Sequence, residues 1–186
     1  MKRLLLKFIG ILLVNVILIS PINQVNAAEY KLNVTKYSQE KSNWCWVACA
    51  KMLGKYYGRS YSQSQICKHV KNKVVNETAS LSQVTSAIRY ATKKSVLQGG
   101  VAKFNGFVIN MKAKNPAVLK MGWNAGGGHV YVVAGLKEAK GIRLDSLYLI
   151  DPIKGRSSGY YGYAGLVNGM TLASGTGRYT HTWSLH

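Results

Sequence analysis

Acidic residues are scarce in this sequence. Its 186 residues include 25 lysines and arginines but only 6 aspartates and glutamates, so the formal net charge is +19. The basic residues are spread along the chain rather than gathered in one block, which predicts a cationic surface and not a charged tail. A surface of this sign favours polyanionic partners.

The sequence patterns of several site classes are also missing. No zinc-finger spacing, RNP-like run or basic zipper is present, so we expect no nucleic-acid partner. Cys67 and His69 form the only close Cys/His pair, and no second pair follows at ligand spacing, so we expect no metal site. The triple glycine of residues 126–128 precedes a strand-like segment rather than a helix, which argues against a phosphate-binding loop. We therefore expect no cofactor.

The chain has one long apolar run, and it lies at the N-terminus. A cationic start (residues 1–7) is followed by an apolar segment (8–19) and by small residues around Ala27. This order is typical of a secretion signal, and the run is short for a membrane span; a retained N-terminal anchor is the alternative. We expect cleavage after Ala27 and secretion of residues 28–186 as one monomeric domain. Loss of the three cations in residues 1–7 would lower the formal charge from +19 to +16. Outside the cell, anionic cell-wall polymers, membranes and acidic proteins are the polyanions that such a surface would meet.

Helical patterns fill the first part of the remaining chain. Residues 44–57 are apolar on nearly every face, which predicts a helix at the centre of the domain. Ser42 or Asn43 is a candidate cap for this helix, and Gly58 is expected to end it. Two shorter helices are expected over residues 62–70 and 81–91, and residues 104–112 are an ambiguous fourth segment.

Strand-like segments follow Asn115. They are rich in β-branched and aromatic residues and are separated by glycine-rich turns. The segments are PAVLKMGW, HVYVVAGL, SLYLIDP and RYTHTWSL. Helices first and strands second predict an α+β fold, in which an N-terminal helical lobe faces a C-terminal antiparallel sheet or half-barrel. The junction between the two lobes is a natural cleft.

The cysteine count is odd, and the three cysteines differ in position. Cys45 lies at the expected start of the central helix, where unpaired N–H groups and the helix dipole stabilise a thiolate, the nucleophilic form. Cys49 lies one turn further in, and Cys67 lies in the next helix. We therefore expect a Cys49–Cys67 disulfide and a free Cys45, with a structural role for Cys45 as the alternative.

A thiolate nucleophile needs a base, and His129 is the best candidate among four histidines. It follows the glycines of residues 126–128, which would let a substrate backbone come close, and it begins a core strand. The other three, His69, His181 and His186, lie in an ordinary helix, in the last strand and at the C-terminus.

The base in turn needs an orienting group, and the sequence contains only two aspartates. Asp145 lies in a polar, hairpin-like stretch, whereas Asp151 ends an apolar strand and precedes a proline. A carboxylate at a strand end can accept the imidazole N–H and fix its tautomer. We expect this role for Asp151, although an Asp-Pro turn is a common structural feature.

At this point the residues resemble a known family. Gln39, five intervening residues and then Cys45-Trp46 at the start of a central helix resemble the papain-like cysteine peptidases. The runs NWCWVACAKMLGKYYG, SQSQIC, GWNAGGGHVYVVAG and YLIDP resemble its compact bacterial branch, which includes the AvrRpt2-like effectors and relatives of the C39 peptidases. The resemblance covers about residues 37–170.

The resemblance implies a papain-like two-lobed fold with four catalytic residues. Cys45 would be the nucleophile, His129 the base and acid, Asp151 the orienting residue and Gln39 the side-chain donor to the oxyanion. Asp stands where papain itself has Asn. The residues expected to contact the substrate are Trp46, Gly127 and Gly128.

The sequence therefore predicts a secreted cysteine peptidase that acts on a protein or peptide. One alternative keeps the same residues for deamidation, transamidation or hydrolysis of cell-wall peptides, since a fold does not fix a reaction. Another is a cationic binding protein or toxin in which these residues are idle.

Overall fold

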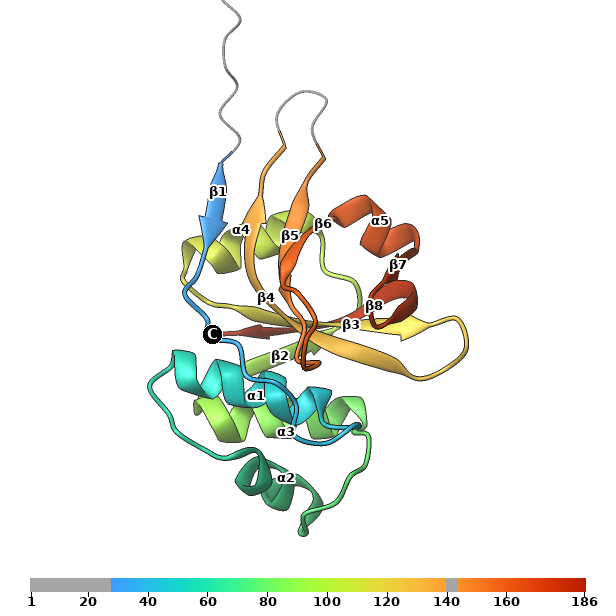
Figure 1. Ribbon diagram of the computed structural model, residues 1–186. Coiled ribbons are helices and arrows are strands. Elements are labelled where there is room, and N and C mark those ends of the chain that lie inside the picture. The colour runs from blue at the N-terminus through green and yellow to red at the C-terminus, as the bar shows by residue number, and fades with distance from the viewer. Residues whose placement is uncertain (1–27, 140–143) are drawn as a thin grey trace, which may run out of the picture.

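The computed structural model describes residues 28–139 and 144–186. The expected secretion signal, up to Ala27, lies outside these residues. Within them the chain forms the expected α+β fold, with a helical part first and most strands after it. The helices are α1 (Cys45–Tyr56), α2 (Gln63–Lys71), α3 (Leu81–Thr92), α4 (Phe104–Lys112) and α5 (Tyr163–Asn168) (Figure 1). The predicted helices over 62–70 and 81–91 are confirmed, and the ambiguous segment 104–112 is helical.

The strands form one antiparallel sheet. Its order is β2-β8-β3-β4-β5-β6, while β1 pairs with β4 and β7 pairs with β8. The four segments predicted as strands form β3, β4, β5 and β8. The strands are β1 (Glu29–Lys31), β2 (Val96–Gly99), β3 (Ala117–Trp123), β4 (Gly128–Lys137), β5 (Ser146–Ile150), β6 (Gly159–Gly162), β7 (Met170–Leu172) and β8 (Gly175–Leu185).

The sheet is covered by helices on both faces. In Figure 1, α1 and α3 lie below it and α4 and α5 lie above it. Along β4, Val130 and Val132 pack with α1 and α3, whereas Tyr131 and Val133 pack with α4 on the other face. Burial on both faces explains why the β4 sequence is an almost continuous apolar run rather than an alternating one. Strand β4 is therefore a rigid base for any residue at its ends.

Helix α1 is the central helix that the sequence predicts. Eight of its 12 residues are buried, and it packs between α3 and β4. The approach to α3 is close, because a Cβ on Gly54 would lie 2.9 Å from the backbone oxygen of Ala91. Gly58 follows the helix with φ of +75°, which favours glycine and ends α1 as expected.

The predicted cap of α1 is wrong. The residue before the helix is Trp44, and no side chain accepts a hydrogen bond from the first turn. Ser42 and Asn43 are instead bonded to Asn76. Asn76 Nδ2 donates to Ser42 Oγ at 2.9 Å, and Asn43 Nδ2 donates to the backbone oxygen of Asn76 at 3.0 Å. These contacts fix the turn before α1 against the loop after α2 and leave the helix terminus open.

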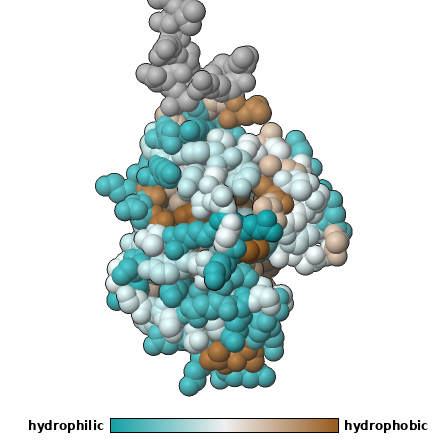
Figure 2. Space-filling model, in the orientation of Figure 1, coloured by the Kyte–Doolittle hydropathy of each residue, from teal (hydrophilic) through white to brown (hydrophobic). Residues whose placement is uncertain are grey.

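The viewed surface is mainly hydrophilic (Figure 2). Among the described residues, three lysine–glutamate pairs are within 4.0 Å, so most of the 25 basic side chains have no acidic partner. The large apolar side chains that are exposed are Val74, Leu97, Val101, Ile109 and Leu144. No helix in the described part of the chain is both long and apolar enough to cross a bilayer.

Candidate active site

Cys45 is the first residue of α1, at its uncapped end. The first turn contains no acidic residue, and the Cys45 side chain is half-buried. The N–H groups of a first helical turn have no acceptor within the helix, and their dipoles point outward along its axis. This position therefore offers N–H donors to an anion beside Cys45.

The two tryptophans beside Cys45 hold a loop in place. Trp44 Nε1 donates to the backbone oxygen of Val75 at 2.6 Å, and Trp46 Nε1 donates to that of Glu77 at 3.1 Å. Both indoles are almost completely buried. The pair therefore anchors the segment between α2 and α3 against the helix that carries Cys45, and this segment forms one wall of the site.

His129 and Asp151 form a buried pair on the sheet. His129 lies near the start of β4 and Asp151 follows the end of β5, and these strands are neighbours. His129 Nε2 lies 2.9 Å from Asp151 Oδ1, and the two residues are 6% and 5% exposed. Since Nε2 is bonded to the carboxylate, Nδ1 is the ring nitrogen available to Cys45. The sequence placed these residues at two strand ends, and the structure brings them together.

Further hydrogen bonds fix the carboxylate. Ser174 Oγ donates to Asp151 Oδ2 at 2.5 Å, and the backbone N–H of Ile153 donates to Oδ1 at 2.9 Å. The ring of Tyr131 packs edge-on against the imidazole, with ring centroids 4.7 Å apart. The pair is thus held from three sides and has little freedom to reorient.

The charges of this pair favour its ionised form. Burial by itself lowers the pKa of His129, but hydrogen bonds with Asp151 and Cys45 outweigh burial and raise that pKa to about 9. Burial raises the pKa of Asp151, yet the hydrogen bonds from His129, Ser174 and Ile153 lower it below its usual value. An imidazolium next to a carboxylate is therefore favoured at neutral pH.

Cys45 and His129 line one cavity of about 220 Å³. Its walls include all three residues expected to contact substrate, Trp46, Gly127 and Gly128. Gly128 has φ of +155°, and a Cβ there would lie 2.3 Å from the Met121 backbone oxygen. Only glycine fits that position, and the lack of a side chain keeps the approach to His129 open.

Gln39 lies beside the site but is engaged in a turn. Its backbone N–H donates to the Pro152 oxygen at 2.7 Å, next to Asp151. Its side-chain Nε2 donates to the backbone oxygens of Lys41 at 3.0 Å and Ser42 at 2.7 Å, and its Oε1 is buried without a partner. Both amide hydrogens are thus used by local carbonyl groups, and the oxyanion role of Gln39 stays a prediction.

The expected disulfide between Cys49 and Cys67 is not present, because all three cysteines are free. The two thiols point to different parts of the fold. Cys49 Sγ lies 3.4 Å from the Val130 backbone oxygen, while Cys67 Sγ faces the backbone oxygens of Lys73 and Val75. Burial, followed by the charges of Cys45 and Asp151, raises the pKa of Cys49 well above its usual value, so this thiol stays protonated.

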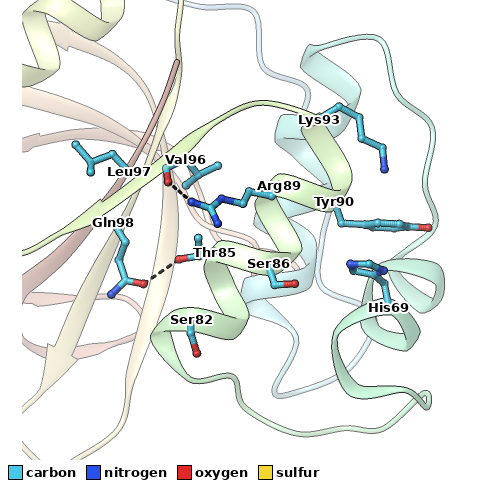
Figure 3. Close-up of a pocket in the computed structure, with 10 residues that line it drawn as sticks. All are labelled: His69, Ser82, Thr85, Ser86, Arg89, Tyr90, Lys93, Val96, Leu97 and Gln98. Carbon is cyan, nitrogen blue, oxygen red and sulfur yellow. Dashed lines mark hydrogen bonds between the residues drawn. The ribbon is translucent and has the colours of Figure 1, made fainter.

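A larger groove, of about 640 Å³, is lined by none of these residues; its lining comes mainly from α3 and β2 (Figure 3). It contains His69, which stacks on Tyr90 with centroids 3.9 Å apart. Its polar groups bond mainly to one another: Arg89 donates to the Val96 oxygen and Thr85 to Gln98. It lacks a nucleophile paired with a base, so its size alone does not make it the reactive site.

Two residues of the site escaped the sequence analysis. Ser174 lies in the turn between β7 and β8, and no sequence pattern links it to Asp151. Lys120 lies in the middle of an apolar segment and lines the cavity. A lysine between Leu119 and Met121 on an otherwise buried strand is the one signal that could have indicated it.

Comparison with known protein families gives one match over most of the chain. The sequence profile described as "Papain-like cysteine protease AvrRpt2" matches residues 26–163. No sequence among the curated proteins matches the chain.

Several solved structures are similar in fold. A Bacillus anthracis protein described as a C39-like peptidase has a TM-score of 0.58 at 12% identity, covering 86% of this chain and 98% of its own. The peptidase domain of Streptococcus ComA, a bifunctional ABC transporter, has a TM-score of 0.53 at 15% identity, with 84% and 99% covered. A double-glycine-motif protease from an AMS/PCAT transporter, in complex with its leader peptide, has a TM-score of 0.50 at 17% identity, with 84% and 95% covered. At these identities the similarity concerns the fold alone.

Proposed function

Because the chain belongs to the family of papain-like cysteine proteases described by AvrRpt2, we propose that it is a secreted bacterial peptidase in which Cys45, His129 and Asp151 hydrolyse a peptide bond. The carrying observation is the buried bond between His129 Nε2 and Asp151 Oδ1, which leaves the other ring nitrogen to Cys45 in a shared cavity. The substrate is a protein or peptide, and the reaction needs no cofactor.

In the first half of the reaction, the Cys45 thiolate attacks the carbonyl carbon of the scissile bond. A carbon–sulfur bond forms and the carbonyl electrons move to oxygen. When this intermediate collapses, the C–N bond breaks and the His129 imidazolium gives its proton to the leaving amine. Asp151 stays ionised and keeps the imidazole oriented.

In the second half, water replaces the thiol. His129, now neutral, removes a proton from water as its oxygen attacks the thioester carbon. The carbon–sulfur bond then breaks, the carboxylic acid product leaves, and the thiolate–imidazolium pair is restored. His129 therefore gives one proton to the leaving amine in the first half and takes one proton from water in the second half, while Asp151 stays ionised.

The oxyanion of both halves would be stabilised by donors next to the thiol. The backbone N–H of Cys45 at the open terminus of α1 is one, and the Gln39 side chain is the other. Gln39 would have to exchange one of its bonds to Lys41 or Ser42 for the oxyanion.

The experiment that tests this function is digestion of a diverse peptide library with residues 28–186 under mild reductant, read by mass spectrometry. Cys45→Ala and His129→Gln should abolish new peptide termini, whereas the matched control His69→Gln should not. New termini that persist in Cys45→Ala would contradict the proposal. Intact peptides with a deamidation or cross-link mass shift would identify the alternative chemistry of the same residues.

Export is a separate part of the proposal and has its own test. The chain, expressed with residues 1–27 in a Gram-positive host, should be recovered from the medium with Ala28 at its N-terminus. Retention with an intact N-terminus would instead support a membrane anchor. The cationic surface makes anionic wall polymers the expected surroundings of the exported protein.

A further inference from the structure

One cationic side chain lies in the cavity that holds the nucleophile. Apart from His129, Lys120 is the only charged residue among those that line this cavity, and none of the lining residues is acidic. The lining also includes the apolar side chains of Ala79, Leu81 and Val84. The cavity therefore combines apolar side chains with one lysine ammonium, beside the proposed Cys45–His129 ion pair.

The fold holds Lys120 in this place. It lies in β3, where it pairs with Val130 of β4, one residue from His129. Its Cε lies 3.1 Å from the position that a Cβ on residue 128 would take, so the side chain extends across Gly128. The same glycine that keeps the approach to His129 open therefore also makes room for the lysine stem.

The charge of Lys120 has no acidic partner in the described part of the chain. All six acidic residues lie in the described part of the chain, and none is within 4.0 Å of Lys120. Its cross-strand neighbour His181 has a buried Nδ1 without a hydrogen-bond partner. Burial and the nearby Lys120 charge both lower the pKa of His181, so this neighbour stays neutral and does not supply an anion.

From this geometry we propose that Lys120 forms a subsite for a carboxylate, so that the enzyme prefers substrates with Asp or Glu within two residues of the cleaved bond. An ammonium without an acidic partner, in a cavity with apolar side chains, matches a side chain with a short methylene stem and an anionic end. The cavity is small and includes Cys45 itself, and a residue spans at most about 3.6 Å of extended chain, which limits the distance from the cleaved bond. The inference rests on the proposed peptidase function.

The first test compares peptides that differ only in charge. Each peptide that is cleaved in the library digest is synthesised in two versions, one with Glu and one with Gln at the same position. This is done for every position within two residues of the cleavage site. The wild type should show a kcat/KM about tenfold higher or more for Glu at one position, the range of a charge-assisted hydrogen bond. Lys120→Met should remove this difference, and Lys120→Glu should favour Lys over Glu at the same position. An unchanged Glu/Gln ratio in Lys120→Met would overturn the subsite.

The matched control is Lys103→Met. Lys103 is exposed and precedes α4 on the opposite face of the sheet, so this variant loses the same charge away from the cavity. It should keep the Glu preference of the wild type. Loss of the preference in both variants would mean that the overall charge, and not Lys120, selects the substrate.

A second test does not depend on turnover. The alkylation rate of Cys45 is measured with iodoacetate, which is anionic, and with iodoacetamide, which is neutral. The iodoacetate-to-iodoacetamide rate ratio should fall at least about threefold in Lys120→Met and stay constant in Lys103→Met. An unchanged ratio in Lys120→Met would overturn the inference even if peptides are cleaved. A lower ratio without any peptide cleavage would support the subsite and reject the peptidase function.

Discussion

The helical part and the sheet part contribute to the site in opposite ways. Helices α2 and α3 each begin with a complete capping box, formed by Ser62 with Gln65 and by Ser80 with Gln83. Helix α1, which carries Cys45, has no side-chain cap. Helices α4 and α5 also lack a side-chain cap, but among the three helices below the sheet only α1 does, and its N–H groups beside Cys45 stay available to an anion.

On the sheet, by contrast, the His129–Asp151 pair is held by several hydrogen bonds. Asp151 accepts hydrogen bonds from a histidine, a serine and a backbone N–H. Cys45, the proposed nucleophile, thus lies at an open terminus, while the proposed acid–base pair is held rigidly. In the proposed mechanism, reactivity at Cys45 would come from unsatisfied N–H donors, and correct protonation of His129 from satisfied hydrogen bonds.

The largest effect on activity should come from a change in the His129–Asp151 pair. Asp151→Ala removes the carboxylate that is hydrogen-bonded to the imidazole and that stabilises the imidazolium. We expect kcat/KM to fall about 10²- to 10⁴-fold, the range of general acid–base catalysis. Peptide cleavage measures the loss, and urea denaturation checks that the variant is folded. A loss of less than tenfold would mean that Asp151 only shapes the turn before Pro152.

The second prediction concerns the contribution of the His129–Asp151 pair to stability, which depends on pH. The pKa of His129 is raised from 6.5 to about 9, so protonated His129 stabilises the folded state fully below pH 6.5. This contribution, about 3 kcal/mol, is lost as the pH rises through 9. Urea denaturation between pH 6 and 10 should show the decline in the wild type, but not in His129→Gln. In Cys45→Ala the decline should begin at lower pH, because one of the interactions that raise the pKa of His129 is missing.

The third prediction compares helices in the two parts of the molecule. Gly54→Ala should destabilise by about 1–3 kcal/mol, since the added Cβ would meet Ala91 O of α3 at 2.9 Å. Gly106→Ala in α4 has open space, with its nearest neighbour at 4.0 Å, and should stabilise by about 0.5–1 kcal/mol. Free energies of unfolding measure both. Equal effects in the two variants would contradict the close packing of α1 against α3.

The smallest effect is expected for Ser174→Ala. The change removes one of the hydrogen bonds to Asp151, which should raise the pKa of that carboxyl and lower kcat by about tenfold or less. The acid limb of the kcat–pH profile should therefore move to higher pH. Ser174→Thr, which keeps the hydroxyl, should restore the wild-type profile. A fall in kcat with an unmoved acid limb would give Ser174 a purely structural role.

Much of the fold follows from local patterns that the sequence displays. The all-round apolar residues 44–57 require a buried helix, and Ser62 and Ser80 begin helices as capping residues do. The apolar strand-like segments become β3, β4, β5 and β8. Short strands such as β1 and β7 cannot be predicted from the sequence, because three residues are too few to show a periodicity. They are strands only because they pair with β4 and β8.

For the site, the sequence by itself determined which residue types could react. A cysteine at a helix start, a histidine after three glycines and an aspartate at a strand end are local features, and they were found without the structure. The expected cap of α1 and the Cys49–Cys67 disulfide were wrong because they depend on which way side chains point across the fold. Asn76 binds the two candidate caps, and backbone oxygens of two different segments face the two thiols.

Only the tertiary structure decided that His129 meets Asp151, that Ser174 holds Asp151 and that Lys120 lies across Gly128. Each of these contacts joins residues that are separated along the chain, and antiparallel strand pairing sets their register. A one-residue change of register in β3 or β4 would turn Lys120 or His129 to the other face of the sheet. The amino-acid sequence determines which chemistry each side chain can perform, and the pairing register of β3, β4 and β5 determines which of these side chains lie close together.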